Sequence, residues 1–464
     1  MIVAAPPLVT ALWPHQQEAI AFVERLWRAD RPGAMLAMAM GAGKSRVAIE
    51  LIQRNNLYPA LILAPKSVVS VWPEQFARYG NPQGHFTILP LEGPLIRRAA
   101  TLSQAFARAR ARDGQPAPII AITNYDGAWK GSLRDTILAQ RWACVIADES
   151  HRLQSPGGRQ SWFAKELAKR ARYRLALTGT PLSSSPLSIY AQYRFLDPSV
   201  FGTSFVRFRG RYAVMGGYGR YQVLGYQNLD DLSRRMYSIA HRADASVLDL
   251  LPPTDERLEC DLEPEARRIY RELEHDFVAD LERGTITVTN ALTKLLRLQQ
   301  IAGGSVGDDD GALRQVSSAK AGALADALDA LAAAEPVVVF CRFRADLDVV
   351  HAIAAKQGRI TLELSGRVNQ LAEWQAGGSP VLAVQVQAGG LGVDLTRARY
   401  CIFYSLGFSL AEYEQARARL HRPGQTRHVI YVHLVVRGTV DQHLYRALAA
   451  KGDVVRAVLD GMQQ

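Results

Sequence analysis

Short aliphatic runs alternate with longer amphipathic stretches in two separate parts of the chain, and this alternation constrains the fold more than any other feature. In the first part the runs are 34–39, 60–64, 119–123, 143–147 and 174–177. In the second part they are 337–341, 360–364, 381–384, 400–404 and 428–435. Such alternation is typical of βαβ units, which form parallel sheets and bind ligands at the carboxyl ends of their strands. The sequence therefore predicts an α/β fold with two parallel-sheet lobes.

The segment between the two lobes has a different texture. Residues 201–228 are rich in Gly, Tyr and Arg, helical patterns follow to about residue 300, and 303–311 reads as a solvated connection. A chain of 464 residues has room for two or three domains of about 100–200 residues each. We expect lobe one at 1–197, a mixed, largely helical insert and connection at 198–315, and lobe two at 316–464.

Composition limits the partners and the compartment. The 55 Lys and Arg against 44 Asp and Glu give a net charge of +11, which favours a polyanion such as nucleic acid or simply solubilises the surface. No uncharged apolar stretch approaches the roughly 20 residues of a membrane-spanning helix. The four cysteines form no CxxC pair, which argues against a zinc site or a disulfide scaffold and favours a reducing compartment. We expect a cytoplasmic protein, in the host cytoplasm if a phage encodes it.

A glycine-rich turn follows the first aliphatic run and precedes a helical pattern at 46–53. A turn of this kind leaves backbone N–H groups free to surround phosphates at a helix N-terminus. We expect the phosphates of a nucleotide to be bound by Gly41, Ala42, Gly43, Lys44 and Ser45. Lys44 would reach the β and γ oxygens, and the Ser45 hydroxyl would hold Mg²⁺. Met38 replaces the first glycine of the usual pattern, so the turn taken alone could be accidental.

Two adjacent carboxylates end the run at 143–147. Asp148 is placed to hold Mg²⁺, directly or through water, and Glu149 is placed to orient and polarise an attacking water. His151 would link the site to its neighbours. A pair of solvated acids in a loop is the alternative, but the glycine-rich turn on another strand makes that coincidence rarer. Together the two elements indicate a Mg²⁺-dependent nucleotide hydrolase.

The ordered series of motifs resembles helicase superfamily-two ATPases of the DEAD/DEAH-box class, in their Swi/Snf branch and in a minimal form common in phages and prokaryotes. In the first lobe, residues 12–16 resemble the glutamine motif, 64–67 motif Ia, 123–125 motif Ib, 148–151 the box and 177–182 motif III. In the second lobe, residues 339–341 resemble motif IV, 387–395 motif V and 415–425 motif VI. The resemblance implies two tandem RecA-like P-loop lobes that use ATP and Mg²⁺ and act on DNA.

The resemblance also assigns roles to single residues. Gln16 would contact adenine, and Gln415, Arg419 and Arg422 would complete the ATP site from lobe two, the arginines as fingers worth about 10³–10⁵-fold in rate. A basic helix face is the alternative for the two arginines. Nucleotide state would be coupled to the nucleic acid through His151, Thr178 and Thr180. The sugar-phosphate backbone would be gripped by Pro65, Lys66, Thr123, Asn124, Gly390 and Asp394.

Two further candidates for nucleic-acid contact come from composition. Residues 97–112 carry five arginines and form either a basic helix stripe or an ordinary solvated face. Residues 201–228 interleave cations and rings without any acid, and Arg209, Arg211 and Tyr221 represent this platform. The alternative is that these rings make the small core of the insert itself.

Three functions are consistent with these patterns. The first is an ATP-dependent DNA translocase or helicase, with or without strand separation. An RNA helicase is the second, although the Swi/Snf-like residues in the motifs favour DNA. The third is a nucleotide-gated clamp for a protein partner with little turnover, against which intact Glu149, Arg419 and Arg422 argue. Two departures limit the resemblance: the acidic residues usual before motif I are absent, and no strand-contacting segment follows 364–367.

Overall fold

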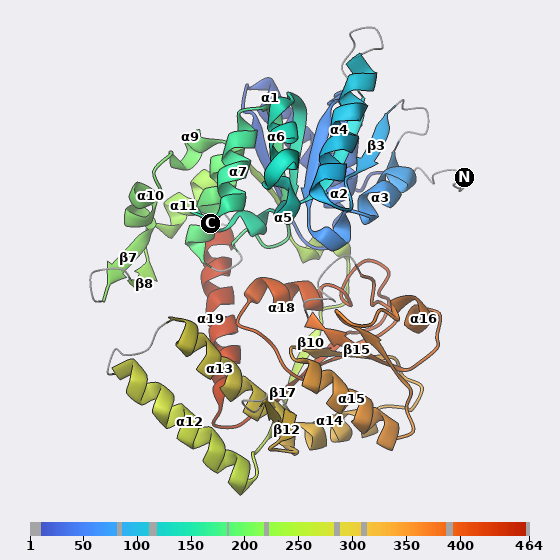
Figure 1. Cartoon of the computed structure of the whole chain (residues 1–464), viewed down its shortest axis with the longest axis vertical. Coiled ribbons are helices and arrows are strands. Elements are labelled where there is room, and N and C mark those ends of the chain that lie inside the picture. Colours follow the sequence, from blue (N-terminus) through green and yellow to red (C-terminus); the bar gives the residue numbers. More distant parts are fainter. Residues whose placement is uncertain are drawn as a thin grey trace. The chain divides into compact units, whose positions relative to one another are not determined.

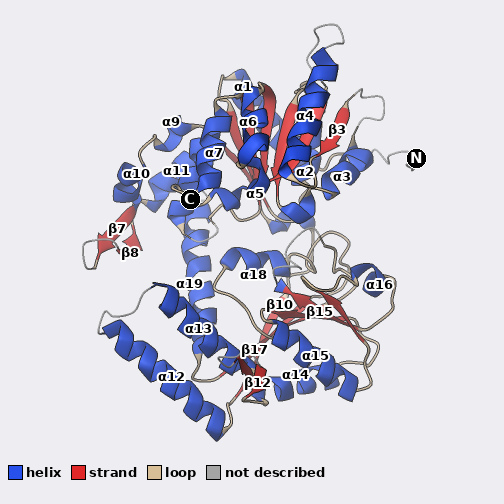
Figure 2. Cartoon of the chain, in the orientation of Figure 1, coloured by secondary structure: helices blue, strands red, loops and turns tan. Residues whose placement is uncertain are grey.

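The computed structural model describes residues 11–80, 86–110, 118–182, 185–217, 222–282, 288–307, 313–386 and 393–460. The chain forms two compact units, one of Met1–Asp249 with Asp453–Gln464 and the other of Leu250–Gly452. Each unit contains a parallel sheet with helices packed on it (Figures 1 and 2). The predicted α/β class with two parallel sheets is confirmed.

The sheet of the first unit has seven strands in the order β3-β4-β2-β5-β6-β1-β9, all paired in parallel. Five strands lie on the predicted runs: β1 (Gly33–Met38), β2 (Ala60–Ala64), β4 (Ile119–Asn124), β5 (Trp142–Asp148) and β6 (Ala171–Thr178). The edges are β3 (Thr87–Pro90) and β9 (Ala240–Ala243), which the aliphatic runs do not reveal. Because β9 pairs with β1, the first unit continues well past residue 197.

Helices cover both faces of this sheet, and alternate residues of one strand feed two separate cores. In β1, Met35 and Ala37 belong to one core, and Leu36 and Met38 to the other. The second core also takes residues from α1 (Pro14–Arg28), α2 (Lys44–Arg54) and α3 (Val71–Tyr79). The first core takes residues from α4 (Leu95–Arg110), α6 (Gly131–Ala139), α7 (Arg159–Ala168) and α8 (Ile189–Leu196). Burial on both faces explains the continuous aliphatic runs.

The segment after α8 builds onto the first unit. It contains α9 (Pro198–Phe201), α10 (Phe205–Tyr212), the hairpin β7 (Ala213–Gly216) and β8 (Gln222–Tyr226), and α11 (Leu229–Tyr237). The ring of Phe208 lies 5.0 Å from that of Tyr190 on α8, and Phe201 lies 4.9 Å from Tyr193. These aromatic side chains therefore extend the core of the first unit.

The second unit has a six-stranded parallel sheet in the order β10-β17-β16-β13-β15-β14. The strands are β10 (Thr254–Cys260), β13 (Val337–Cys341), β14 (Thr361–Leu364), β15 (Val381–Gln385), β16 (Tyr400–Phe403) and β17 (Ile430–Val436). Its helices include α14 (Ala319–Asp329), α15 (Arg344–Lys356), α16 (Leu371–Gln375), α18 (Leu410–Arg417) and α19 (Val440–Asp460). All predicted runs of lobe two became strands, and β10 is an additional edge strand.

Two long helices, α12 (Pro264–Glu282) and α13 (Val288–Gly303), follow β10 and precede the short antiparallel pair β11 (Ser305–Gly307) and β12 (Leu313–Gln315). They belong to the second unit. The segment 198–315, expected as one insert, is thus divided between the two units at Asp249. All four cysteines are free, and Cys144, Cys341 and Cys401 are buried. None of the helices in the described ranges is long and apolar enough to span a bilayer.

Candidate functional site

The glycine-rich turn of the first unit, residues 39–43, connects β1 to α2. We call it the phosphate turn. Gly41 and Gly43 have φ values of +84° and +86°, a backbone region that glycine adopts without strain, and Gly43 caps α2. The Lys44 Nζ donates to the carbonyl oxygens of Met38 at 3.0 Å and Ala39 at 3.3 Å. The lysine is therefore folded back across the turn that precedes its own helix. Such a turn presents backbone N–H groups and one ammonium group to an anion at a helix N-terminus.

Two side chains at the start of α1 hold this turn. The Gln16 Nε2 donates to the carbonyl oxygen of Ala42 at 3.1 Å, and the His15 Nε2 bonds the same oxygen at 2.9 Å. Any side chain at Gly43 would collide with the Gln16 amide. The prediction assigned Gln16 to adenine, and the structure shows it supporting the phosphate turn. His15 is a supporting residue that sequence reasoning missed, although it is the neighbour of Gln16.

Asp148 ends β5, and its carboxylate is buried with one hydrogen bond on each oxygen. Its Oδ2 accepts from the indole Nε1 of Trp72 at 3.0 Å, its Oδ1 accepts from the backbone N–H of Glu149 at 3.0 Å, and its carbonyl accepts from the Tyr125 hydroxyl at 2.7 Å. Burial raises the pKa of Asp148 well above its usual range, and the Glu149 charge adds to this, while Trp72 and Lys44 oppose it. A buried carboxylate of this kind gains from a nearby cation.

Glu149 has a strained backbone. Its φ is +50°, which is uncommon for any residue except glycine and is typical of functional sites. The carboxylate Oε2 lies 3.3 Å from the Nδ1 of His151, and the same Nδ1 lies 3.4 Å from the Thr178 Oγ1. The predicted acid Glu149 therefore contacts the predicted coupling residue His151, which in turn contacts Thr178 at the end of β6.

Motif III connects this acid to the phosphate turn. The Thr178 Oγ1 accepts from the backbone N–H of Thr180 at 3.0 Å. A Cβ at Gly179 would lie 3.3 Å from the Met40 side chain and 3.5 Å from the Met38 carbonyl, so Gly179 packs closely on the turn. Buried Gln192 on α8 then joins the two motifs, because it accepts from the Ser150 hydroxyl at 2.7 Å and donates to the Pro181 carbonyl at 2.8 Å. Sequence reasoning missed Gln192, and it placed Trp72 beside motif Ia and Tyr125 in motif Ib without predicting their contacts with Asp148.

The donors at this edge of the sheet fit Mg²⁺. This ion is held in nucleotide sites by one or two carboxylates and a hydroxyl, with substrate phosphates and water completing the shell. The buried Asp148 carboxylate and the hydroxyl of Ser45, the second residue of α2, are donors of this class. Within the described residues there is no cluster of three or more His, Cys, Asp or Glu side chains suited to a metal, so the site is not a protein-only cage.

The second unit carries the predicted arginines in a turn after α18, residues 418–425, which we call the arginine turn. Gln415 and Arg419 are buried, and the Arg422 Nη1 donates to the carbonyl of Val393 at 3.2 Å. The turn is tied to the segment before β16, because the Leu395 N–H donates to the Arg419 carbonyl at 3.1 Å. Gln425 extends the tie, because its Nε2 donates to the Ala398 carbonyl at 2.8 Å.

The residues predicted to contact the nucleic-acid backbone differ in their exposure. Lys66 is exposed, directly after the buried Pro65. Thr123 and Asn124, the residues predicted from motif Ib, are buried. They are buried because β4 is a central strand that is covered on both faces. Arg98 on α4 instead donates to the Asn124 Oδ1 at 2.6 Å, and this contact fixes an arginine beside motif Ib.

The other residues predicted to contact nucleic acid have the following surroundings. Asp394 uses its Oδ1 to cap its own turn through Thr396, and Gly390 lies outside the described residues. Arg211 pairs with Asp231 at 2.9 Å, and the Arg209 guanidinium lies 6.0 Å from the centre of the Phe205 ring. Tyr221 lies outside the described residues. Phe208 and Tyr212 belong to the core and Phe201 packs against it, which agrees with the alternative that the rings of 201–228 make a core.

Comparison with known families identifies the family of the chain. The description of an SNF2-related domain matches residues 15–303, and that of a helicase conserved C-terminal domain matches residues 319–424. The chain belongs to the SNF2-related family. The Swi/Snf-like resemblance predicted from the motif series is therefore confirmed.

This SNF2-related chain is similar to proteins of very different length. It is 26% identical over 474 residues to the mouse protein named DNA annealing helicase and endonuclease ZRANB3, which covers 98% of this chain and 41% of that protein. It is 25% identical over 454 residues to the putative protein p41 of Acyrthosiphon pisum secondary endosymbiont phage 1, covering 91% and 94%. The solved Sulfolobus solfataricus SWI2/SNF2 ATPase core in complex with dsDNA aligns over 100% of this chain and 96% of that chain, with 20% identity and a TM-score of 0.44. The chain spans less than half of the mouse relative.

Proposed function

We propose that this SNF2-related chain is an ATP-dependent DNA translocase that hydrolyses ATP with Mg²⁺. The contact series from the phosphate turn through Gly179 and Thr178 to His151 and Glu149 carries the proposal. It places an acid, its partner and the phosphate-binding turn at one sheet edge. A nucleotide-gated clamp with little turnover has no need for a strained, paired glutamate.

The residues of the first unit have separate tasks in hydrolysis. Lys44 and the N–H groups of the turn neutralise the phosphate oxygens, so that charge developing on them is stabilised. Glu149 takes the proton of the attacking water, and His151 at 3.3 Å fixes the orientation of that carboxylate. Ser45 and Asp148 would hold Mg²⁺, which supplies charge neutralisation on the phosphates. Trp72 holds the Asp148 carboxylate in place from the second core.

The arginines of the second unit supply the remaining charge. Arg419 and Arg422 follow one another within a single turn, and both act on the phosphates that the first unit binds. Because the two halves of the site belong to different units, hydrolysis requires the units to close on ATP. Repeated closing and opening would then move the grips along the nucleic acid.

DNA is the polymer that we propose for this motor. The net charge of +11 suits a phosphate backbone, and exposed Lys66 and the Arg98–Asn124 pair place cations at motifs Ia and Ib. Relatives that the whole chain matches include one named as a DNA annealing helicase. Contacts of this kind give salt-dependent affinity with little sequence preference, as a translocating motor requires.

One experiment tests the proposal. ATP turnover is measured for the full chain without nucleic acid and with duplex DNA, single-stranded DNA or RNA, and E149Q is the inactive control. Stimulation by DNA above RNA is expected. Stimulation by RNA alone would identify an RNA helicase, and no stimulation would contradict the motor. A strand-displacement assay under the same conditions then separates translocation on duplex DNA from strand separation.

A further inference from the structure

The chain passes between the two units twice, after Asp249 and after Gly452. The first strand after the first passage is β10, and the second passage lies within α19. β10 pairs with β17 along seven residues, and α19 begins four residues after β17 ends. Both connections therefore lead to the same pair of strands in the second unit.

A cluster of five side chains joins this pair of strands to the base of the arginine turn. Arg417, the last residue of α18, forms a two-point ion pair with Asp255 on β10, with Nη2 to Oδ2 at 2.9 Å. The guanidinium also lies 4.1 Å from the centre of the Tyr431 ring and 5.3 Å from that of Tyr413. His433 on β17 completes the cluster, because its Nε2 lies 3.0 Å from the Asp255 Oδ1. We call these residues the Arg417 cluster.

The cluster is rigid by its geometry. The Arg417 side chain is 17% exposed and that of His433 is 4% exposed, so both are shielded from water on several sides. Burial alone would raise the pKa of Asp255, but the hydrogen bonds from His433 and Arg417 outweigh it and hold that pKa well below its usual range. The Tyr431 hydroxyl also donates to the Arg417 carbonyl at 2.7 Å, which fixes the backbone at the start of the turn. A planar, two-point arginine pair stacked on rings gives stronger geometric control than an exposed ion pair.

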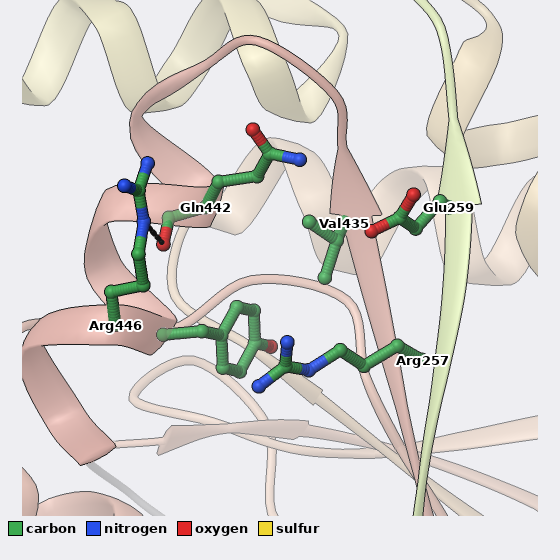
Figure 3. Close-up of a pocket in the computed structure, with 6 residues that line it drawn as sticks. Arg257, Glu259, Val435, Gln442 and Arg446 are labelled. Atoms are coloured by element: carbon green, nitrogen blue, oxygen red, sulfur yellow. Dashed lines mark hydrogen bonds between the residues drawn. The ribbon is translucent and has the colours of Figure 1, made fainter.

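Further contacts extend the cluster to each connection. The His421 Nε2, within the arginine turn, bonds the carbonyl of Leu251 at 2.8 Å, two residues after the first passage. Tyr445 on α19 packs its ring edge-on against His433, with 5.0 Å between the ring centres. Figure 3 shows the neighbouring part of β10, β17 and α19, where side chains surround a cavity of about 240 Å³. The cavity is lined by Arg257 and Glu259 of β10, Val435 of β17, and Gln442 and Arg446 of α19.

We propose that Arg417 and Asp255 are positioning residues that tie both connections to the arginine turn, so that movement of the connections on DNA binding sets Arg419 and Arg422 for hydrolysis. The inference rests on the proposed function and adds a route by which DNA stimulates turnover. Arg417 precedes the two arginines by two and five residues, so little chain is available to absorb a displacement. Its guanidinium is occupied by Asp255, Tyr413 and Tyr431. Its effect is on placement, and placement errors of about 1 Å can cost roughly 100-fold in rate.

The test compares R417A, R417K and D255N with the unchanged full chain. ATP turnover and the KM for ATP are measured with and without saturating duplex DNA, and melting temperature is measured in parallel. We expect R417A and D255N to lose about 10- to 100-fold in DNA-stimulated turnover while the basal rate and KM stay close to normal. R417K keeps the charge without the two-point geometry and should lie between. Because the Asp255 side chain is half-exposed, we expect D255N to fold, so it tests the ion pair even if R417A does not fold.

R437A is the matched control. Arg437 forms a similar ion pair with Asp261 at the far end of the same two strands, away from the arginine turn. It should leave stimulation unchanged. Equal losses of basal and stimulated rates in R417A, or full stimulation in R417A and D255N, would overturn the inference. If the unchanged chain itself shows no response to DNA, the proposed function falls first, and the coupling route falls with it.

Discussion

The two units present their candidate site residues at different ends of their parallel strands: at the carboxyl ends of β5 and β6 in the first unit, and at the amino ends of β16 and β17 in the second. In the first unit, side chains contact one another directly: Asp148 bonds Trp72, and Glu149 pairs with His151. In the second unit, the arginine turn is held mainly through its backbone and through Gln425 and Arg417. We therefore interpret the first edge as the proposed reaction site, and the second as a frame that presents two cations.

The buried carboxylates of the two units show the same contrast. Burial raises the pKa of both Asp148 and Asp346. Asp148 lies at the end of a strand beside the phosphate turn, where a metal ion would relieve its isolation. Asp346 caps the first turn of α15 by accepting from the Phe343 N–H at 3.1 Å, and it accepts from the Ser405 hydroxyl. The difference teaches that a perturbed buried acid marks a catalytic site only when it faces a binding turn.

Removing an arginine from the second edge should have the largest effect. R422A deletes a guanidinium that would stabilise charge on the transferred phosphate, so we expect turnover to fall by about 10³-fold or more. ATP affinity, measured by equilibrium binding, should stay close to normal, because the first unit holds the phosphates. R427A is the control, since Arg427 is bonded to Glu335 and to the Arg397 carbonyl on the surface. Unchanged turnover in R422A would remove its finger role.

Neutralising the acid at the first edge should have the next largest effect. E149Q keeps the size and the strained backbone position but cannot take a proton, so turnover should fall by about 10²–10⁴-fold. Binding of ATP should be retained, in contrast to K44A, which should lose both. Circular dichroism checks that each variant is folded. A folded E149Q protein with the normal rate would show that another group activates the water.

The fold was predictable where a strand forms an aliphatic run. All ten aliphatic runs became strands: nine are central and covered on both faces, and the tenth, the edge strand β14, is still mostly buried. β10 and β9 escaped detection because edge strands tolerate charge: β10 reads Thr-Asp-Glu-Arg-Leu-Glu-Cys. Since β10 carries Asp255, the Arg417 cluster could not be predicted from the sequence either.

The candidate site divides in a similar way. The phosphate turn and the acid pair are local patterns, so their residues were identified directly. Trp72 and Gln192 act from elements far along the chain, and nothing in their own sequence context points to Asp148 or Ser150. Thr123 was assigned to nucleic acid by motif position, which does not reveal that the residue is buried. Contacts between distant elements therefore remain invisible to sequence patterns.

A smaller effect should follow from loosening the metal-binding acid. W72F keeps most of the ring volume but removes the Nε1 that donates to Asp148 at 3.0 Å. Loss of such an outer partner costs about 10- to 100-fold in metal affinity or activity. The measurement is ATP turnover as a function of Mg²⁺ concentration, and we expect a higher half-saturating concentration. W142F is matched, because the Nε1 of that buried tryptophan donates to the Ile137 carbonyl instead. The same Mg²⁺ dependence in both variants would contradict a special role for Trp72.

The smallest expected effect concerns the buried acid of the second unit and appears in stability. Burial raises the pKa of Asp346 from 3.8 to about 6 in the folded chain. The folded state therefore binds this proton more tightly than the unfolded state, so its stabilising contribution is full below pH 4 and is lost as the pH rises through 6. Two pKa units correspond to at most about 3 kcal/mol. D346N removes this dependence, so relative to the unchanged chain it should gain in urea midpoint between pH 4 and pH 7. D348N, an exposed change on the same helix, should follow the unchanged chain. If the urea midpoints of D346N and of the unchanged chain change with pH in the same way, Asp346 does not titrate in this range. The contrast with Asp148 would then rest on geometry alone.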